Sequence, residues 1–450
     1  MNKKIIIIGA GPTGIGAGYR LKEIGYKNFK ILEKNDYIGG LSASFSRDGG
    51  YTVDIGGHVL FSHYDYFDKV VEDALQAEYL EHIREAWIWM QNKFVPYPFQ
   101  NNIKFLPKEM MLECLTGLIN TNPPPKTNNF SEWIYSVFGA GIAKYFMNPY
   151  NYKVWAHPLE MMSKNWIAER VSVIDLKHVL TNVILDKTET SWGPNNTFKF
   201  PKVGGTGEIF RNIAKKIQKH IKLNSKIIKI DTQNKIVTLT DGNKESYDIL
   251  INTSPLDCLV KSSDFSEQLK ASTQDLLFSN GYSVGIGFKR PLEEALKTKC
   301  WNYFPEENSP FYRVTYLSNY SPNMVPDIKE NFLLMCETSY SEYKQHDPRT
   351  ILKDTIDGLI NSKFIQESDL EIIDFTDVID IKYSYPIPSL NRDNALNILM
   401  SELEKNKIYS RGRFGQWRYE TGNMDHSFMQ GVEVINFIIE GKSETTRFAH

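Results

Sequence analysis

The residues most informative about chemistry are glycines near the N-terminus. Gly9, Gly11 and Gly14 follow an isoleucine run at Ile5–Ile8 and precede a segment with helical character, and a second apolar run ends at Glu33. This order of strand, glycines, helix, strand and acid is typical of a dinucleotide-binding βαβ unit. The glycines permit a tight turn and let the backbone approach a pyrophosphate, which the helix N-terminus attracts. A carboxylate at position 33 would accept hydrogen bonds from ribose hydroxyls.

A second glycine pair follows the acid by a few residues. Gly39-Gly40 would bring more backbone to the dinucleotide, and this favours FAD over NAD because the longer flavin half must be held beyond the pyrophosphate. A plain turn is the alternative interpretation. The cofactor-binding residues predicted from these two segments are Gly9, Gly11, Pro12, Thr13, Gly14, Glu33, Gly39, Gly40, Leu41 and Ser42.

A third glycine pair, Gly56-Gly57, precedes His58 and suits close approach of the backbone to a flat ring. The local sequence leaves open whether His58 is functional or structural. His58 and His63 lack the helical i,i+4 spacing of a metal pair, so no metal site is predicted. Because the chain contains no HExxH or CxxC pattern, an enzyme of this sequence would leave the hard chemistry to its cofactor.

The composition excludes several classes of protein. The 450 residues are 41% hydrophobic and 24% charged with a net charge of −2, which is ordinary for a globular protein and argues against a general binder of nucleic acids or anionic membranes. The four cysteines are scattered, which is typical of free thiols in a reducing compartment. No run approaches the roughly 20 apolar residues of a membrane span. We therefore expect a cytoplasmic protein without membrane insertion.

The element pattern predicts an α/β protein with an FAD-binding Rossmann-type domain, a helical insertion domain and a mainly antiparallel β-sheet domain. Strand-like segments surround a predominantly helical stretch at about 107–186, and the chain ends in a loop and a helix. The FAD-binding domain is therefore predicted to be discontinuous. The predicted boundaries are 1–95, 200–280 and 405–450 for the FAD-binding domain, 105–195 for the helical domain, and 281–404 with part of 80–104 for the sheet domain.

Several longer segments resemble the eukaryotic-type UDP-galactopyranose mutases. They occur in the family's order over nearly the whole chain, whereas generic flavoproteins share only the N-terminal glycines. The segments are DIGGHVLFSHY at 54–64, FVPYPFQNN at 94–102, YKVWA at 152–156, ERV at 169–171, GPN at 193–195, GGTG at 204–207, FYR at 311–313 and GRFGQWRYE at 412–420, followed by GN at 422–423 and DHS at 425–427.

This resemblance implies a flavin-dependent isomerase that interconverts UDP-galactopyranose and UDP-galactofuranose. In the family, N5 of reduced FAD attacks the anomeric carbon, UDP leaves, and a covalent flavin–sugar intermediate opens and recloses with a different ring size. The reaction causes no net redox change, but the flavin must first be reduced, and NADPH or NADH is the expected reductant. The resemblance leaves the oligomeric state open and implies no nucleic-acid partner.

The resemblance also assigns roles to residues. The implied catalytic residues are His58, Arg170 and Arg313, of which the two arginines hold and neutralise the diphosphate of UDP. The implied substrate-binding residues are Phe61, Arg84, Tyr97, Phe99, Gln100, Phe146, Asn151, Trp155, Asn195, Tyr303, Tyr385, Tyr419 and Asn423. Those that match the family's uridine-binding region are Tyr97, Phe99, Gln100, Phe146, Asn151 and Trp155. The implied flavin contacts beyond the glycine segments are Gly56, Gly57, His58, Arg413, Asn423 and Ser427.

Three positions depart from the family pattern, and three alternatives remain open. Glu208, Met424 and Gln430 stand where other residues are expected, so the same chemistry on another UDP-sugar is one alternative. A flavin amine oxidase-like oxidoreductase is the second, because it shares the glycine-rich unit. A non-enzymatic nucleotide-binding module would bind FAD or UDP without turnover.

Overall fold

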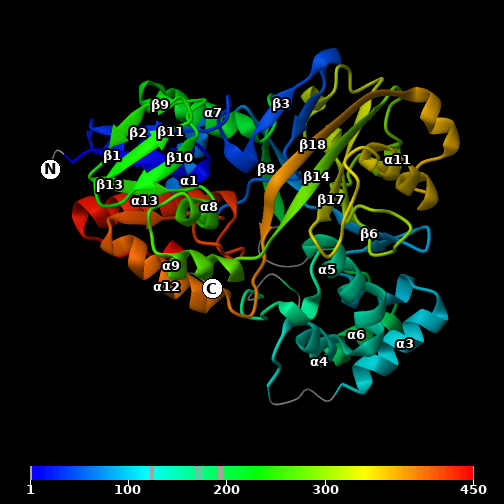
Figure 1. The fold of residues 1–450 in the computed structure, drawn as a ribbon. Coiled ribbons are helices and arrows are strands. Elements are labelled where there is room, and N and C mark those ends of the chain that lie inside the picture. Colours follow the sequence, from blue (N-terminus) through cyan, green and yellow to red (C-terminus); the bar gives the residue numbers. More distant parts are fainter. Residues whose placement is uncertain (1–2, 122–125, 168–170, 172–174, 191–195, 449–450) are drawn as a thin grey trace.

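The computed structural model describes residues 3–121, 126–167, 171, 175–190 and 196–448. Two predicted site residues, Arg170 and Asn195, lie outside the described residues. Figure 1 shows three parts: a sheet with its helices that contains both termini, a second and larger sheet, and a helical part below the second sheet. The predicted fold class is confirmed.

The first part is built on a parallel sheet with the strand order β19-β13-β1-β2-β9. The central strand β1 is a run of four isoleucines that are all buried, as expected for a parallel strand that is covered on both faces. The strands are β1 Ile5–Ile8, β2 Phe29–Leu32, β9 Ile221–Lys222, β13 Ile249–Asn252 and β19 Ile408–Ser410.

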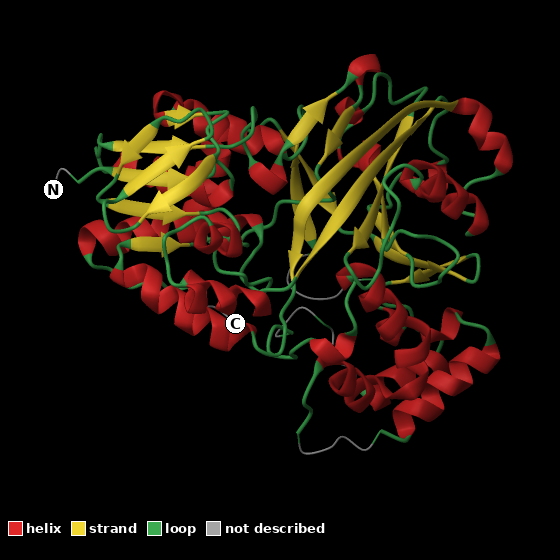
Figure 2. Ribbon diagram, in the orientation of Figure 1, coloured by secondary structure: helices red, strands yellow, loops and turns green. Residues whose placement is uncertain are grey.

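Helices cover one face of this sheet, and a small sheet with further helices covers the other (Figure 2). Ile5 and Ile7 belong to the first apolar cluster, and Ile6 and Ile8 to the second, because successive strand residues point to opposite faces. The first face carries α1 Pro12–Glu23, α2 Asp65–Leu75, α7 Gly207–Lys215 and α13 Met424–Glu440. The second carries β10 Ile227–Asp231, β11 Ile236–Leu239, β12 Lys244–Ser246, α8 Leu256–Lys261, α9 Glu267–Ala271 and α12 Arg392–Lys405.

The C-terminal helix α13 packs directly on the N-terminal helix α1. Glycines make this close approach possible, since a Cβ atom at Gly16 would lie 2.3 Å from the carbonyl oxygen of Phe428, and one at Gly431 would lie 2.0 Å from that of Thr13. The nucleotide-binding part is therefore closed by the two ends of the chain. The predicted boundary between residues 404 and 405 falls inside α12.

The second part is a seven-stranded sheet with the order β18-β14-β17-β16-β15-β6-β7. Its neighbouring strands are antiparallel except for the parallel pair β15–β6. One face packs on α11 Ile351–Asn361, and α10 Leu317–Tyr320 packs on the other face. The strands are β6 Ala86–Met90, β7 Lys93–Pro96, β14 Phe278–Phe288, β15 Trp301–Tyr303, β16 Arg313–Tyr316, β17 Phe332–Tyr340 and β18 Ile373–Pro386.

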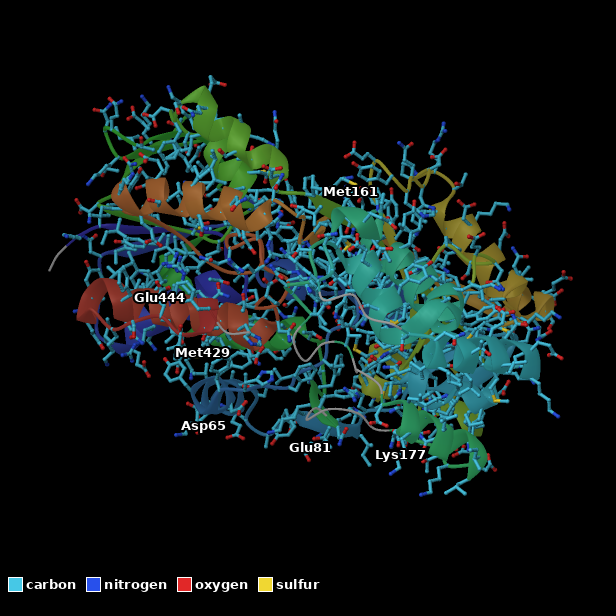
Figure 3. All side chains as sticks on the ribbon, turned by 90° about the horizontal axis from the view of Figure 1, so that it is seen from below. Asp65, Glu81, Met161, Lys177, Met429 and Glu444 are labelled. Atoms are coloured by element: carbon cyan, nitrogen blue, oxygen red, sulfur yellow. The ribbon has the colours of Figure 1, made fainter. Side chains whose placement is uncertain are left out.

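The helical part has its own apolar core, which includes ring residues from several helices. Its helices are α3 Lys108–Ile119, α4 Phe130–Ile142, α5 Asn148–Trp155 and α6 Leu176–Ile184. Seen from below, Lys177 of α6 and Met429 of α13 lie on opposite sides of the molecule (Figure 3). Two short pairs connect the parts: β3 Ser44–Ser46 with β4 Thr52–Asp54, and β5 Tyr79–Ile83 with β8 Thr197–Pro201. Among the described helices, none combines the length and apolar character needed to cross a membrane.

Candidate active site

A cavity of about 1500 Å³ joins the glycine-rich turn after β1 to the face of the larger sheet. It is large enough for a dinucleotide and a further ligand, since small-molecule pockets are usually about 300–1,000 Å³. The predicted site residues that line it are Gly9, Gly11, Pro12, Thr13, Glu33, Gly40, Leu41, Ser42, Gly56, Gly57, His58, Phe61, Arg84, Tyr97, Tyr303, Arg313, Tyr385, Arg413, Tyr419, Asn423 and Ser427.

The remaining described site residues lie behind this lining. Gly14 has a packing role, because a Cβ atom there would lie 2.0 Å from the carbonyl oxygen of Gly9. Gly39 has a φ of +108° and supports the turn that carries Gly40. The others are buried in the helical part or in the segment that leads into it from β7: Phe99, Gln100, Phe146, Asn151 and Trp155.

The glycine-rich turn fits the phosphates of a dinucleotide. Gly11 is the N-cap of α1 and supplies no side chain to the first N–H groups of the helix, which are the usual donors to phosphate. A Cβ atom at Gly11 would meet only the Cα atom of Gly40, at 3.8 Å, so the protein itself leaves room there. The two predicted glycine segments contact each other, since the N–H of Gly39 donates to the carbonyl oxygen of Ala10 at 2.9 Å, and both line the same end of the cavity.

Glu33 lies at the end of β2 and is only 5% exposed. Its carboxylate accepts hydrogen bonds from the backbone N–H of Ala10 at 2.7 Å and from that of Asn35 at 2.8 Å. A carboxylate has about four acceptor positions, so the two donors orient it and leave capacity for ribose hydroxyls. This geometry agrees with the ribose-binding role expected for position 33, which stays a prediction.

At the opposite wall, a buried ion pair joins Arg313 of β16 to Glu337 of β17. Arg313 donates to Glu337 through Nε and through Nη2, the latter at 2.8 Å, and Nη2 also donates to the carbonyl oxygen of Gly57 at 3.0 Å. Burial alone would raise the pKa of Glu337, but the charge and hydrogen bonds of Arg313 outweigh it and hold the pKa below its usual value. The carboxylate is therefore ionised at neutral pH.

Tyrosine and tryptophan rings form a wall beside this ion pair. Tyr419 lies 4.9 Å from Trp155 and 5.9 Å from Tyr385 between ring centroids, and the Arg413 guanidinium lies 5.1 Å from the ring centroid of Tyr385. Trp155 is held from behind, because its Nε1 donates to the side-chain oxygen of Asn151 at 3.3 Å. The wall thus connects the cavity to the core of the helical part.

The predicted uridine-binding rings continue this packing into the helical part. Phe99 stacks on Phe146 with centroids 4.7 Å apart, and Phe146 stacks on Tyr150 at 5.2 Å. Tyr150 in turn lies 5.1 Å from Tyr303, which lines the cavity. The rings form one continuous series, and their contact with a uridine stays a prediction.

His58 follows the Gly56-Gly57 turn and lines the cavity next to the ion pair. Its Nδ1 lies 3.2 Å from the carbonyl oxygen of Gly56, which can only accept, so Nδ1 carries the proton and Nε2 is left as an acceptor. Burial lowers the pKa of His58 to about 4, and the charges of Arg313 and Arg413 act in the same direction against that of Glu337. The ring is therefore neutral at physiological pH.

The low pKa of His58 should make the folded protein less stable in mild acid. The folded pKa of about 4 lies below the ordinary value of 6.5, so between these pH values the unfolded chain binds more protons and stability rises with pH. This contribution is complete above pH 6.5 and is lost as the pH falls toward 4. Thermal melts of the wild type and His58→Gln should show a shallower pH dependence in the variant, and parallel curves would contradict this.

The sequence analysis missed several residues of the site. Glu337 is the only charged residue in the strand FLLMCETSY, whose other residues are apolar or carry a hydroxyl group. A charged residue in such a strand could have been recognised from the sequence as a candidate site residue. Tyr312, beside the predicted arginine, donates to Glu337 at 3.1 Å and lies 3.2 Å from the Tyr385 hydroxyl. These residues bring the tyrosine wall and the ion pair into one hydrogen-bond network.

A second cluster lies at the N-terminus of α13. Asp425 accepts hydrogen bonds from the backbone and the ring of His63, at 3.2 and 2.8 Å, and one potential ligand atom from each of His63, Asp425 and His426 lies within 4.8 Å of the others. The i,i+4 criterion cannot detect a group assembled from two distant segments. Both hydrogen bonds from His63 end on Oδ2 of Asp425, while Oδ1 lies 3.1 Å from Nδ1 of His426.

The fold and site define a flavoprotein, and comparison with known proteins specifies its class. A family model described as flavin containing amine oxidoreductase matches residues 12–359 of the 450. This is more than half of the chain, which therefore belongs to that family. Within it, the chain belongs with the UDP-galactopyranose mutases: it is 43% identical to a crystal structure of reduced UDP-galactopyranose mutase, with a TM-score of 0.96 over 99% of this chain and 96% of that chain. The predicted family is confirmed.

Other relatives share the fold or short segments. Cyclohexylamine oxidase from Brevibacterium oxydans has a TM-score of 0.70 at 15% identity, over 98% of this chain and 99% of that chain, which shows a common fold alone. A 1-hydroxycarotenoid 3,4-desaturase from a Flavobacterium species is 48% identical over 54 residues, which are 12% of this chain and 11% of that protein. The chain thus matches only about a tenth of this curated relative's length.

Proposed function

We propose that this protein interconverts UDP-galactopyranose and UDP-galactofuranose with reduced FAD as its cofactor. The observation that carries the proposal is that the glycine-rich turn and the partly buried Arg313 line one and the same cavity. A dinucleotide site alone would suit any flavoprotein, whereas an arginine with tyrosines around it suits a diphosphate. The 43% identity to a mutase over nearly the whole chain supports the same activity.

In this proposal the chain supplies binding, orientation and a dry site. Reduced FAD, when bound, would supply the nucleophile toward the anomeric carbon of the sugar. Arg313 would stabilise the negative charge that develops on the diphosphate as it departs, and Tyr303, Tyr385 and Tyr419 would donate hydrogen bonds to it. The neutral His58 ring would present Nε2 as an acceptor toward the reacting centre. The uridine would lie against Tyr97 and the helical part.

The further partners follow from this chemistry. NADPH or NADH is the proposed reductant, because the flavin must be reduced before the first turnover. The proposed location is the cytoplasm, where nucleotide sugars and a reducing environment coincide, and the four cysteines are all unpaired. The proposed partners include neither nucleic acid nor membrane.

The decisive experiment is an anaerobic conversion of UDP-galactofuranose by the FAD-loaded protein. With the flavin reduced by dithionite, the pyranose should form until equilibrium, and with the flavin oxidised the rate should be at least about 100-fold lower, since an oxidised flavin is no nucleophile. Separation of the two sugars by chromatography measures the result. A UDP-N-acetyl sugar tested in parallel shows whether the protein prefers UDP-galactose or another UDP-sugar.

The family membership makes an amine oxidase the second candidate. Its signature is flavin reduction by an amine and formation of peroxide in air, with no need for a reductant. That result, combined with no conversion of UDP-galactofuranose by the reduced protein, would overturn the mutase proposal.

A further inference from the structure

We propose that Glu337 is a positioning residue of the active site: its carboxylate holds the Arg313 guanidinium and the Gly57 backbone in one fixed arrangement. The inference rests on the proposed function, because it concerns how the arginine is held for a diphosphate. It adds a residue that neither the motifs nor the family resemblance singled out.

The larger sheet places Glu337 for this role. Glu337 of β17 is the register partner of Arg313 in β16, and Arg313 is in turn the register partner of Tyr303 in β15. Cross-strand partners share one face of a sheet, so the three side chains form a transverse row on the face that lines the cavity. Leu333 and Met335, on the same face of β17, are fully covered by apolar neighbours. The apolar face therefore ends at Glu337, where the cavity begins.

The contacts of Glu337 use most of its acceptor capacity. It receives two hydrogen bonds from Arg313 and one from the Tyr312 hydroxyl, at 3.1 Å. Its side chain is 7% exposed, and that of Arg313 is 19% exposed. A buried carboxylate that accepts three hydrogen bonds is fixed in orientation, and it fixes the groups that donate to it.

The pair also holds the turn that carries His58. The carbonyl oxygen of Gly57 accepts a hydrogen bond from Nη2 of Arg313 at 3.0 Å. A Cβ atom at Gly57 would lie 3.0 Å from Nη2 of Arg313 and 3.2 Å from Oε2 of Glu337, so the backbone lies directly on the pair. The Arg313–Glu337 pair and the Gly56-Gly57-His58 turn therefore hold each other in place.

This arrangement determines what Arg313 can offer a ligand. Glu337 and Gly57 accept from its Nε–H and both Nη2–H groups, so within the described part of the chain the two Nη1–H groups remain for an anion. The proposed reaction requires the diphosphate to leave the sugar and return to the same carbon. Glu337 compensates the guanidinium charge while the diphosphate is away and keeps the Nη1 edge directed to the same place.

The test compares Glu337→Gln with Ser339→Ala in the FAD-loaded protein. The glutamine keeps the size of the side chain but can no longer accept both Arg313 contacts, whereas Ser339 lies on the same strand, is fully buried, and its hydroxyl has no hydrogen-bond partner among the described residues. Turnover per bound flavin is measured with reduced FAD. The Kd of UDP is measured from the change in the absorption spectrum of the oxidised flavin.

We expect Glu337→Gln to lower kcat at least about tenfold, because misplacement of a catalytic group by 1 Å can cost about 100-fold. The amplitude of the UDP-induced flavin spectrum should also change, because the Gly57 turn is released. In an Arg313→Gln background, the same substitution should change kcat/KM less than about threefold, since coupled residues are non-additive. Ser339→Ala should have the wild-type kcat, the wild-type amplitude of the UDP-induced flavin spectrum and the wild-type Kd of UDP.

Two results would overturn the inference. The first is a wild-type kcat and a wild-type flavin spectrum in Glu337→Gln. The second is an equal loss of kcat/KM when Glu337→Gln is introduced into the wild type and into Arg313→Gln, which indicates a general structural defect. If the wild type itself neither binds UDP nor converts UDP-galactofuranose, the proposed function fails instead, so the two failures can be told apart.

Discussion

Arg313→Ala is expected to abolish most of the activity, with kcat/KM for UDP-galactofuranose reduced roughly 30-fold to several thousand-fold. Truncating one member of a buried charge pair at a ligand site costs about 2–5 kcal/mol, and each 1.4 kcal/mol corresponds to about tenfold. Here the loss has two parts, because the variant removes the anion donor and leaves the Glu337 carboxylate without its charged partner. Steady-state kinetics of the reduced enzyme measure the combined effect.

Stability measurements separate the two parts. An unpaired buried carboxylate costs about 3–5 kcal/mol of folding stability, so Arg313→Ala should melt at a lower temperature than the wild type. The double variant Arg313→Gln with Glu337→Gln removes both charges and should recover most of this stability without recovering activity. A double variant with restored activity would show that Arg313 contributes only to folding, contrary to the assigned role.

The part of the site that the sequence predicts best is the part built from neighbouring residues. The segment from Ile5 to Glu33 contains a strand, a turn, a helix and a second strand in order, so local spacing determines its geometry. The same holds for the Gly56-Gly57-His58 turn, whose glycines lie against the Arg313–Glu337 pair. In both places a single segment of the sequence already predicts the local structure, and the fold adds the contacts with other segments.

Partners that come from distant segments could not be found in this way. Glu337 and Arg313 are 24 residues apart and meet only because β16 and β17 pair in a particular register. His63 and Asp425 are 362 residues apart, and α13 must return to the first sheet before they touch. The register of strands and the docking of a terminal helix depend on the whole fold, whereas a sequence motif reports only its own segment.

The predicted uridine-binding residues show a different limit. The resemblance identifies Phe99, Phe146 and Trp155 as ligand contacts, but their side chains are at least 97% buried in the protein. A ring series that supports a wall and a ring series that touches a base have the same residue types, so composition cannot separate them. Of the predicted uridine-binding residues, Tyr97 is the one whose ring lines the cavity, and its contact with the base stays a prediction.

Gly11→Ala is expected to release FAD while leaving the apoprotein intact. Gly11 has a φ of −79°, which alanine adopts without strain, and the added Cβ atom would meet only the Gly40 Cα atom, at the ordinary distance of 3.8 Å. The apoprotein should therefore melt within a few degrees of the wild-type apoprotein. The methyl group would lie where the backbone must approach the pyrophosphate, so the FAD affinity should fall more than about tenfold.

Gly14→Ala provides the contrast, because its Cβ atom would lie 2.0 Å from the carbonyl oxygen of Gly9 and no flexible side chain can move aside. This overlap should destabilise the apoprotein itself, by about 1–3 kcal/mol as in other overpacked cores. Thermal melts of FAD-free protein and FAD titrations followed by flavin fluorescence measure both quantities for both variants. Wild-type FAD affinity in Gly11→Ala would show that the pyrophosphate lies elsewhere in the cavity. The two glycines are three residues apart at the start of α1, and the structure predicts that Gly11 is required by the ligand and Gly14 by the fold.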